Sequence, residues 1–525
     1  MREITKYLFV AVLTHVLVVS AWTQNDILDH KDNILIQKIH AVNSTARETN
    51  LSISPDGKYL YFMSDRGGQI WSGYSGTYNG RPRYDGDIWY STKAGDKWRP
   101  PVCLGIGVNT SSGEDEPMIS QDGQYVVYQS WKYNWKVTGG PYYQAELKGG
   151  KFTNSRGLGG GISKFILTQY IRSGNTYATD GAAMSPDGKT FLLCCGPRYD
   201  GNLDIYISRK KNGVWSYMKK LEISTPGDER SVFIAGDGKT VYFASDGYMG
   251  YGGLDVYKTT LNDDGTCGEV VNIGAPFNTT KDDYGFITTA SGNESYFVRE
   301  GDVYSANTQK ADPRLKPGNT VIISGSVKNQ KGEALEVHLE LKDGKTGASI
   351  STSKSDSRNG EFLFSTSDVS GSYRIGDLDN MKIDTTFSID IDKNILEIHI
   401  DIIIDDGSAN STTTESIMVN FEHDRAILDE KDRAQLDDIV TKAKGAKTYE
   451  IEIIGHTDVH GSIEYNKKLG RERASSMRDY LVQNGLDSDL IKVSSDGESN
   501  LIELNQKSPA AERNRRAELT IVYSN

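Results

Sequence analysis

The sequence has few cysteines and few prolines and is short of basic residues, and these shortages exclude several classes of protein. Its four cysteines form no Cys-x-x-Cys pair, which argues against zinc binding and dithiol redox chemistry and leaves any disulfide pairing open. The 59 Lys and Arg residues are outnumbered by 71 Asp and Glu, for a net charge of −12. Because this charge repels phosphate, we expect no nucleic acid partner.

Glycine and tyrosine are plentiful, with 54 and 29 residues against only 13 prolines. Glycine allows tight turns and tyrosine favours half-buried strands, so we expect a mainly β chain. At 525 residues the chain is long enough for about three to five domains. Its 37% hydrophobic and 25% charged residues fit neither a disordered chain nor a polytopic membrane protein.

Residues 1–21 are typical of an export signal. Arg2 and Lys6 supply a basic end, residues 7–19 are apolar, and Val19-Ser20-Ala21 offers small residues before a cleavage point. The alternative is a single transmembrane anchor, but an apolar run of about 13 residues is shorter than the roughly 20 needed to span a bilayer. We therefore expect a mature chain without a transmembrane segment and, with no cysteine at the cleavage point, without a lipid anchor.

A turn motif recurs through the first 300 residues. The sequence Ser-Pro-Asp-Gly-Lys begins at Ser54 and at Ser185, each time before an apolar run, and weaker copies begin at Ser120, Gly236 and Ser291. An Asp-Gly turn between two apolar runs predicts a β-hairpin. Hairpins repeated at intervals of about 50 to 66 residues are typical of propeller blades, which bury their faces only against neighbouring blades.

These repeats resemble those of TolB-type, WD40-like propellers. The resemblance implies a β-propeller over residues 22–312 with about five blades, or six if residues 24–50 supply strands. Acidic segments at residues 113–117 and 227–229 are interpreted as turns between blades that carry surface acids, with calcium or ligand contacts as the alternative. Since such propellers occur in binding modules, we expect this one to contact other proteins.

Residues 318–404 alternate apolar and polar positions with period two, which predicts a small β-sandwich. The order of strands and the segment Asn359-Gly360-Glu361-Phe362 resemble the carboxypeptidase-regulatory-like domain. Residues 405–415 are polar and are predicted as a linker.

Residues 416–525 combine helix and strand patterns. Helices are predicted at residues 430–444 and 462–484, and strands near residues 449–454, 491–495 and 517–523. This order predicts an α+β domain. The whole chain is therefore expected to be multidomain and mainly β, with an N-terminal propeller, a sandwich and a C-terminal α+β domain.

Three motifs in this last domain carry the functional prediction. Gly455-His456-Thr457-Asp458 follows a predicted strand, residues 466–474 lie on the next predicted helix, and Asn514-Arg515-Arg516 precedes the last strand. Together they resemble the OmpA-like peptidoglycan-binding domain of OmpA and the peptidoglycan-associated lipoproteins. The resemblance implies that the chain binds peptidoglycan by recognising diaminopimelate.

Diaminopimelate presents a carboxylate and an ammonium group on one small zwitterionic end. Binding it requires one fixed anion and one fixed cation, and the planar arginine fork suits the carboxylate. The resemblance assigns the ligand ammonium to Asp458 and the ligand carboxylate to Arg473. The alternative is an intramolecular salt bridge between these two residues.

The resemblance gives four further residues a place in this pocket. Asn466 and Arg515 support it, and Thr457 and Leu469 shape it. The alternative for Arg515, together with its neighbour Arg516, is a solvated or structural pair.

No metal, cofactor or catalytic site is expected. His456 and His460 lie four residues apart, but metal binding at this spacing requires a helix, and Gly455 and Gly461 flank a loop here, so the spacing does not predict a metal pair. The chain has no Gly-x-Ser-x-Gly nucleophile motif and no phosphate-binding loop. We therefore expect a protein that is not an enzyme.

The domain order resembles PorE-type components of the type IX secretion and gliding apparatus. It implies a periplasmic adaptor of a Gram-negative, Bacteroidetes-like bacterium, associated with peptidoglycan and the outer membrane. The propeller would contact outer-membrane or secretion-complex proteins. The alternatives are a purely structural tether between outer membrane and wall, and a propeller-based enzyme or sensor acting on wall fragments, which needs convergent carboxylates with shifted pKa values.

Overall fold

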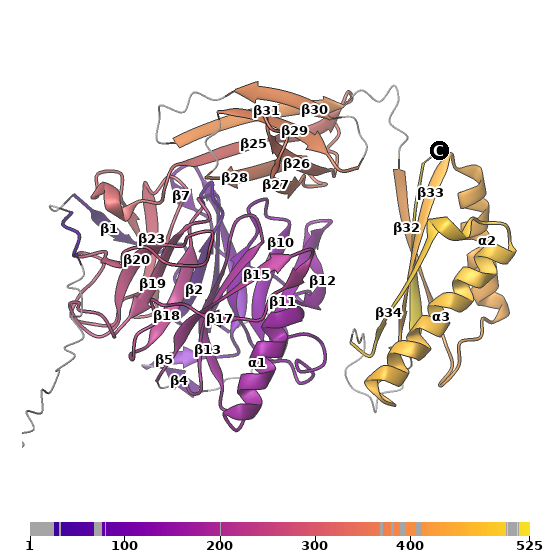
Figure 1. Ribbon diagram of the computed structural model, residues 1–525, viewed down its shortest axis with the longest axis horizontal. Coiled ribbons are helices and arrows are strands. Elements are labelled where there is room, and N and C mark those ends of the chain that lie inside the picture. The colour runs from indigo at the N-terminus through magenta and orange to yellow at the C-terminus, as the bar shows by residue number, and fades with distance from the viewer. Residues whose placement is uncertain are drawn as a thin grey trace, which may run out of the picture.

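The computed structural model describes residues 26–30, 33–67, 76–78, 80–199, 201–367, 371–379, 383–388, 395–404, 412–499, 501, 512 and 514–524. The predicted export signal lies outside these ranges. The described chain is mainly β, as expected, and most of its strands belong to antiparallel sheets (Figure 1).

Five antiparallel sheets follow one another along the N-terminal part of the chain. The first consists of β2 (Glu48–Ile53), β3 (Tyr59–Ser64), β6 (Asp87–Ala94), β7 (Lys97–Trp98) and β8 (Val102–Cys103), and a small hairpin of β4 (Gly76–Tyr78) and β5 (Arg81–Arg83) is inserted in it. The second consists of β9 (Glu114–Ile119), β10 (Tyr125–Ser130), β11 (Tyr142–Lys148) and β12 (Lys151–Gly157).

The other three sheets have the same meandering order. The third consists of β13 (Ala178–Met184), β14 (Thr190–Gly196), β15 (Asp204–Lys211), β16 (Val214–Trp215) and β17 (Lys219–Lys220). The fourth consists of β18 (Glu229–Ile234), β19 (Thr240–Ser245), β20 (Asp255–Thr260) and β21 (Val271–Asn272). The fifth consists of β22 (Tyr284–Thr288), β23 (Glu294–Arg299), β24 (Asp302–Asn307) and β1 (Leu35–Lys38).

The first strands of these five sheets, which we call the inner strands, form a closed cycle of contacts. We call the five sheets together the ring. β2 contacts β9, β9 contacts β13, β13 contacts β18, β18 contacts β22, and β22 contacts β2 again. β1 pairs antiparallel with β24, with Leu35 opposite Asn307. Residues from the start of the ring thus complete its last sheet, and the described residues contain five such sheets and no sixth.

The repeated turn motif forms the same local structure in three sheets. Gly57 has a φ of 73°, a conformation that glycine adopts without strain. The serine Oγ donates to the aspartate Oδ1 at 2.6 Å in each of the pairs Ser54–Asp56, Ser120–Asp122 and Ser185–Asp187. The motif therefore fixes the hairpin through contacts within five residues.

Acidic residues at the start of the inner strands are buried, so the prediction of surface acids at these positions is wrong. Glu114 and Glu229 have no exposed surface. They accept hydrogen bonds at 2.6 Å from the hydroxyl groups of Thr110 and Thr225. These bonds offset the cost of burying a carboxyl group, and burial raises the pKa of each carboxyl to about 7.

Helix α1 (Gly160–Arg172) lies between the second and third sheets along the chain and is absent from the sequence prediction. Its buried residues are Ile162, Phe165 and Ile166. They pack in one core with residues of the second and third sheets, including Tyr142 and Phe191.

Two further sheets pack face to face and form the sandwich. One consists of β28 (Glu361–Thr366), β25 (Thr320–Asn329) and β31 (Ile395–Ile404), and the other of β27 (Ser349–Lys354), β26 (His338–Asp343), β29 (Ser372–Asp377) and β30 (Asp384–Ser388). Val321 and Ile323 of the first sheet share a core with Leu339 and Leu341 of the second. The short helix η1 (Pro313–Leu315) precedes the sandwich.

The C-terminal domain is an α+β domain, as the sequence predicts. Its sheet has the order β32 (Thr412–Asn420), β35 (Arg516–Ser524), β33 (Thr448–His456) and β34 (Ile491–Gly497). α2 (Glu430–Gly445) and α3 (Ile463–Gln483) cover one face of this sheet, and η2 (Ser488–Leu490) precedes β34 (Figure 1). A capping box formed by Asp429 and Asp432 begins α2, where the sequence places a helix start.

The predicted linker at residues 405–415 is too long. Residues 412–415 belong to β32, where Thr412 pairs with Ser524 of β35. The run of three threonines at residues 412–414 is of a residue type that favours a strand over a linker. Residues 405–411 lie outside the described ranges.

The four cysteines are all free. Within the described residues, none of the helices combines the length and the apolar character that crossing a membrane requires.

Candidate functional site

Two glycines bring β33 and α3 into close contact at the predicted site. A Cβ atom on Gly455 would lie 1.7 Å from the carbonyl oxygen of Gly470. A Cβ atom on Gly470 would lie 2.3 Å from Ser495 Oγ and 2.8 Å from the carbonyl oxygen of Gly455. The glycines of both motifs thus allow the loop after β33, which carries Asp458, to lie against the helix that carries Arg473.

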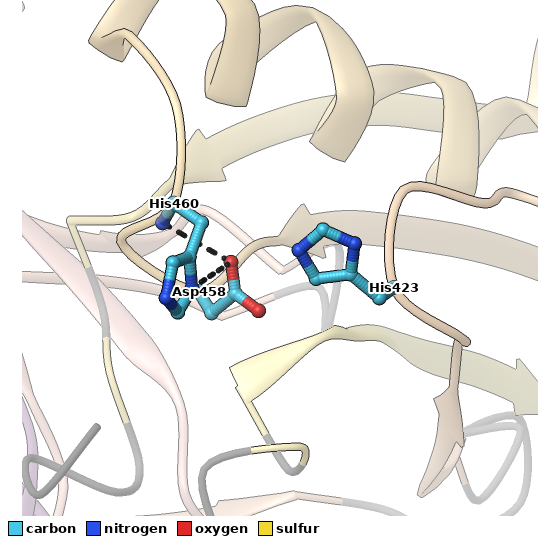
Figure 2. Close-up of side chains that lie close together, drawn as sticks. All are labelled: His423, Asp458 and His460. Carbon is cyan, nitrogen blue, oxygen red and sulfur yellow. Dashed lines mark hydrogen bonds and ion pairs between the residues drawn. The ribbon is translucent and has the colours of Figure 1, made fainter. Parts of the chain in front are cut away.

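Asp458 is a buried carboxylate at the centre of the site, with 5% of its surface exposed. Its Oδ1 accepts a hydrogen bond from the backbone N–H of His460 at 3.2 Å and lies 3.3 Å from His460 Nδ1. Its Oδ2 accepts from Arg515 Nη1 at 3.3 Å. Figure 2 shows the carboxylate between the rings of His460 and His423.

Arg473 is fully buried and is bonded to backbone carbonyls of the loop before α2 and of the end of β33. Nε donates to Arg425 O at 2.9 Å, Nη1 to His456 O at 2.8 Å and Nη2 to Glu422 O at 3.2 Å. Its guanidinium lies 5.5 Å from the centre of the Phe421 ring. Burial lowers the pKa of Arg473 to about 10, and Asp458 opposes this shift, so the group stays charged at neutral pH.

Among the described residues, Asp458 forms ion pairs with Arg515 and His460, and the structure shows no ion pair between Asp458 and Arg473. The two residues still interact electrostatically. The intramolecular salt bridge that the sequence leaves open is therefore replaced by a pair between Asp458 and Arg515.

Arg515 and its neighbour Arg516 have different environments. Arg515 has 18% of its side chain exposed, and its Nε donates to Phe421 O at 3.2 Å. Arg516 is 2% exposed and its Nε donates to Glu518 Oε1 at 2.7 Å. Arg516 thus forms a structural pair with Glu518, whereas Arg515 lies against Asp458.

Thr457, Asn466 and Leu469 are all buried beside the site, with 1%, 0% and 8% exposed surface. Asn466 Nδ2 donates to the carboxylate of Glu498. Within the described part of the chain, Thr457 Oγ1 and Asn466 Oδ1 have no hydrogen-bond partner. Buried polar atoms are rarely left without a partner, so these two oxygens are available for a ligand.

The structure adds residues that the sequence did not predict for the site. Glu422 and Arg425 hold Arg473 through their carbonyl groups. Tyr465 OH donates to the carboxylate of Asp424, which joins α3 to the same loop. No side-chain signal could have identified the first two, because their contribution comes from the backbone.

His456 and His460 do not act as a pair. His456 is 1% exposed, and burial lowers its pKa to about 4. Its Nε2 lies 3.8 Å from Glu518 Oε1. The ring of His460 instead packs edge to face with that of His423, with their centres 5.9 Å apart.

Comparison with known proteins places the similarity in the C-terminal part of the chain. Residues 420–515 match the model of the OmpA family. The Outer membrane protein A of Bordetella avium is 36% identical over 104 residues, which are 20% of this chain and 54% of that protein. The peptidoglycan-associated lipoprotein of Mesorhizobium japonicum is 32% identical over 122 residues, which are 22% of this chain and 72% of that protein.

The comparison with solved structures also finds a similar protein. The crystal structure of the peptidoglycan-associated lipoprotein from Burkholderia pseudomallei is 29% identical, with a TM-score of 0.19, and the match covers 20% of this chain and 88% of that chain. The chain spans only part of several curated relatives, including 54% of the Bordetella avium protein and 25% of the Outer membrane protein A of Serratia marcescens.

Proposed function

The chain belongs to the OmpA family through residues 420–515, and from this membership we propose that it is a cell-envelope protein that binds peptidoglycan non-covalently. Its ligand on the wall is the zwitterionic end of diaminopimelate. One relative, the peptidoglycan-associated lipoprotein of Mesorhizobium japonicum, carries this association in its name.

The observation that carries the proposal is a buried carboxylate beside two guanidinium groups. Asp458 is bonded to Arg515 through Oδ2 and interacts electrostatically with Arg473. A zwitterion can enter such a site by exchange, because its ammonium replaces Arg515 at Asp458 and its carboxylate binds the released Arg515. Neither protein charge is then left buried without a partner.

Arg473 takes the ligand carboxylate together with Arg515. Three of its N–H groups are bonded to backbone carbonyls, and a guanidinium has five. Since the side chain is fully buried, this contact requires a small opening of the loop at residues 421–425. Arg473 therefore fixes the position of the loop as well as the charge of the site.

Thr457, Asn466 and Leu469 complete the pocket. The oxygens Thr457 Oγ1 and Asn466 Oδ1, which lack a partner, accept hydrogen bonds from the ligand ammonium or amide groups. Leu469 contributes an apolar wall.

Sedimentation of the full chain with diaminopimelate-type peptidoglycan tests the proposal. Asp458→Ala and Arg515→Ala should each weaken binding about 10- to 100-fold, since a hydrogen bond to a charged group is worth about 1.5–3 kcal/mol. Arg473→Ala should also lose binding, but it removes three backbone contacts, so Arg515→Ala separates ligand binding from folding. Asp479→Ala, an exposed carboxylate on α3, is the matched control, and equal pelleting of all variants would rule the site out.

The remaining domains provide a second surface, for contacts with other proteins. We propose that the ring is a TolB-type propeller spanning residues 22–312 and that residues 318–404 are a carboxypeptidase-regulatory-like sandwich. The closed cycle of contacts between inner strands supports the first assignment. The propeller would bind proteins of the outer membrane or of a type IX secretion complex. The chain would thereby link these proteins to the wall in the periplasm, and it would have no enzymatic activity.

The structural-tether alternative predicts a different phenotype. If the chain only ties the outer membrane to the wall, removing residues 22–310 would weaken the envelope and leave protein secretion and motility intact. Loss of secretion in that deletion would favour the adaptor.

One observation favours a second candidate, a ligand-binding or sensor site on the inner strands of the ring. Asp115 accepts a hydrogen bond from Asn50 Nδ2 at 2.6 Å, and Glu116 accepts one from Gly181 N at 2.8 Å. Burial raises the pKa of Asp115 to about 6 and that of Glu116 to about 8. Such shifted carboxyl groups are frequent in functional sites. Binding or cleavage of soluble wall fragments by an Asp458→Ala chain, abolished by Asp115→Asn, would establish this candidate.

A further inference from the structure

Three side chains with metal-binding atoms converge at the edge of the diaminopimelate site. His423 lies in the loop between β32 and α2, and Asp458 and His460 lie in the loop between β33 and α3. One ligand atom from each lies within 4.8 Å of the other two. Figure 2 shows the carboxylate between the two imidazole rings.

The spacing of these atoms is close to what a tetrahedral ion requires. Zinc binds imidazole nitrogen at about 2.0–2.1 Å and carboxylate oxygen at about 2.0–2.2 Å, which places neighbouring ligand atoms roughly 3.4 Å apart. Side-chain rotations that move the atoms together by about an ångström would meet this geometry. The rotations are easy because His423 and His460 are exposed, and the His460 side chain is 61% exposed.

The carboxylate of Asp458 is already oriented for such an ion. Oδ1 faces His460, whose Nδ1 lies 3.3 Å away, whereas Oδ2 is bonded to Arg515. An ion can therefore take Oδ1 while Arg515 keeps Oδ2. A group that binds the other oxygen of a metal-ligating carboxylate, as Arg515 does here, fixes the orientation of that carboxylate.

We propose that His423, Asp458 and His460 bind a divalent transition-metal ion, Zn²⁺ in the first place, and that this ion competes with the ligand ammonium for Asp458. Two imidazoles and one carboxylate form a donor set that suits zinc, with the fourth position open to water. The metal site stands on its own geometry, whereas the competition rests on the proposed binding of peptidoglycan.

The competition arises because Zn²⁺ and the ligand ammonium both bind the carboxylate of Asp458. A Zn²⁺ ion on Oδ1 places positive charge on the same carboxylate whose Oδ2 the ligand ammonium would take over from Arg515, so each cation repels the other. Because linkage is reciprocal, zinc lowers the affinity for peptidoglycan by the same factor by which peptidoglycan lowers the affinity for zinc. Wall attachment would thus weaken when the zinc concentration rises.

Zinc binding alone tests the metal site. The full chain without its predicted export signal, purified without a histidine tag, is titrated with ZnCl₂ in the absence of peptidoglycan and followed by calorimetry. We expect one ion per chain at this site and at least a tenfold lower affinity in His423→Ala and in His460→Ala. His338→Ala is the matched control, since His338 is also exposed and lies 3.1 Å from a carboxylate oxygen, that of Asp379. Zinc affinity unchanged in both site variants, or no zinc binding by the wild type, would overturn the site.

Sedimentation with and without ZnCl₂ tests the competition. Zinc should lower pelleting of the wild type with diaminopimelate-type peptidoglycan and should have at least tenfold less effect on the doubly substituted His423→Ala, His460→Ala chain. Equal effects of zinc on both chains would overturn the competition. Failure of the wild type to pellet at all would count against the proposed function, and the calorimetric titration would still decide the metal site.

Discussion

Individual residues of the C-terminal domain show how burial sets charge. His456 follows Gly455 in the same motif that carries Asp458, yet the two side chains lie in different environments. Asp458 keeps its partners Arg515 and His460. His456 is buried, and burial together with the charge of Arg516 lowers its pKa to about 4. The motif histidine is therefore a neutral core residue.

Stability of the C-terminal domain should depend on pH through His456. Its pKa falls from 6.5 in the unfolded chain to about 4 in the folded one, so the folded state binds fewer protons between these values. The stability is fully present above pH 6.5 and is lost as the pH falls toward 4. At pH 5 the wild type should lose about 2 kcal/mol relative to neutral pH, and His456→Asn should lose much less.

Hydrogen exchange of β33 amides in the full chain, corrected for intrinsic rates, measures this loss. His460→Asn, a substitution at an exposed ring, should behave like the wild type in metal-free buffer. The same pH dependence in the wild type and His456→Asn would contradict the account.

The sequence could predict Asp458, Arg473, Asn466 and Arg515 as neighbours because their motifs are local and ordered. It could not predict the full environment of Arg473, since two of the three carbonyls that bind it, those of Glu422 and Arg425, lie 51 and 48 residues away. His423 was missed for the same reason. Only the fold brings residue 423 beside residues 458 and 460.

Secondary-structure elements in the C-terminal domain are held together by glycine contacts. α3 lies against β33 at Gly455 and Gly470, where no side chain fits. This contact sets the distance between the loop of Asp458 and the helix of Arg473. The glycines of the motif are thus structural residues that position the site.

Gly455→Ala should destabilise the domain and weaken wall binding together. A methyl group there would overlap the carbonyl of Gly470, and forcing α3 away should cost about 1–3 kcal/mol. Gly445→Ala is the control, because a Cβ atom at Gly445 meets nothing within 4 Å. Thermal unfolding and sedimentation of both variants measure the effect, and a Gly455→Ala chain as stable as the control would refute it.

At this scale the sequence predicts best where structure is local. The Ser-Asp-Gly turns and the C-terminal helices follow from patterns within a few residues. The sequence does not predict α1, because three glycines, which disfavour a helix, precede its apolar residues Ile162, Phe165 and Ile166. The acidic character of Glu114 and Glu229 favours exposure, and only their bonds to Thr110 and Thr225, each four residues earlier, explain their burial.

Across the whole molecule, the sandwich is bonded to the ring through buried polar side chains. Gln121 Nε2 donates to Ser351 Oγ at 2.8 Å, and Gln121 Oε1 accepts from Ser365 N at 2.9 Å. Lys354 is buried and pairs with Glu146 of the ring at 3.0 Å. These contacts make the ring and the sandwich one unit, a connection that sequence periodicity within either part cannot reveal.

Gln121→Ala should loosen the sandwich from the ring. The change leaves the buried N–H of Ser365 without its acceptor and should cost about 1–3 kcal/mol. Faster hydrogen exchange in peptides that contain β28 would report it. Gln309→Ala, at an exposed position of the ring, should leave exchange unchanged, and the same exchange in both variants would contradict this role of Gln121.

The central claim is that the full chain holds the wall through the carboxylate of Asp458. The most direct measurement is the binding isotherm of the full chain on diaminopimelate-type peptidoglycan, compared with that of Asp458→Asn, which keeps the shape of the side chain and removes its charge. The account predicts saturable binding by the wild type, displacement by free diaminopimelate, and at least tenfold weaker binding by Asp458→Asn. Equal binding by a folded Asp458→Asn chain, with no displacement by diaminopimelate, would contradict it.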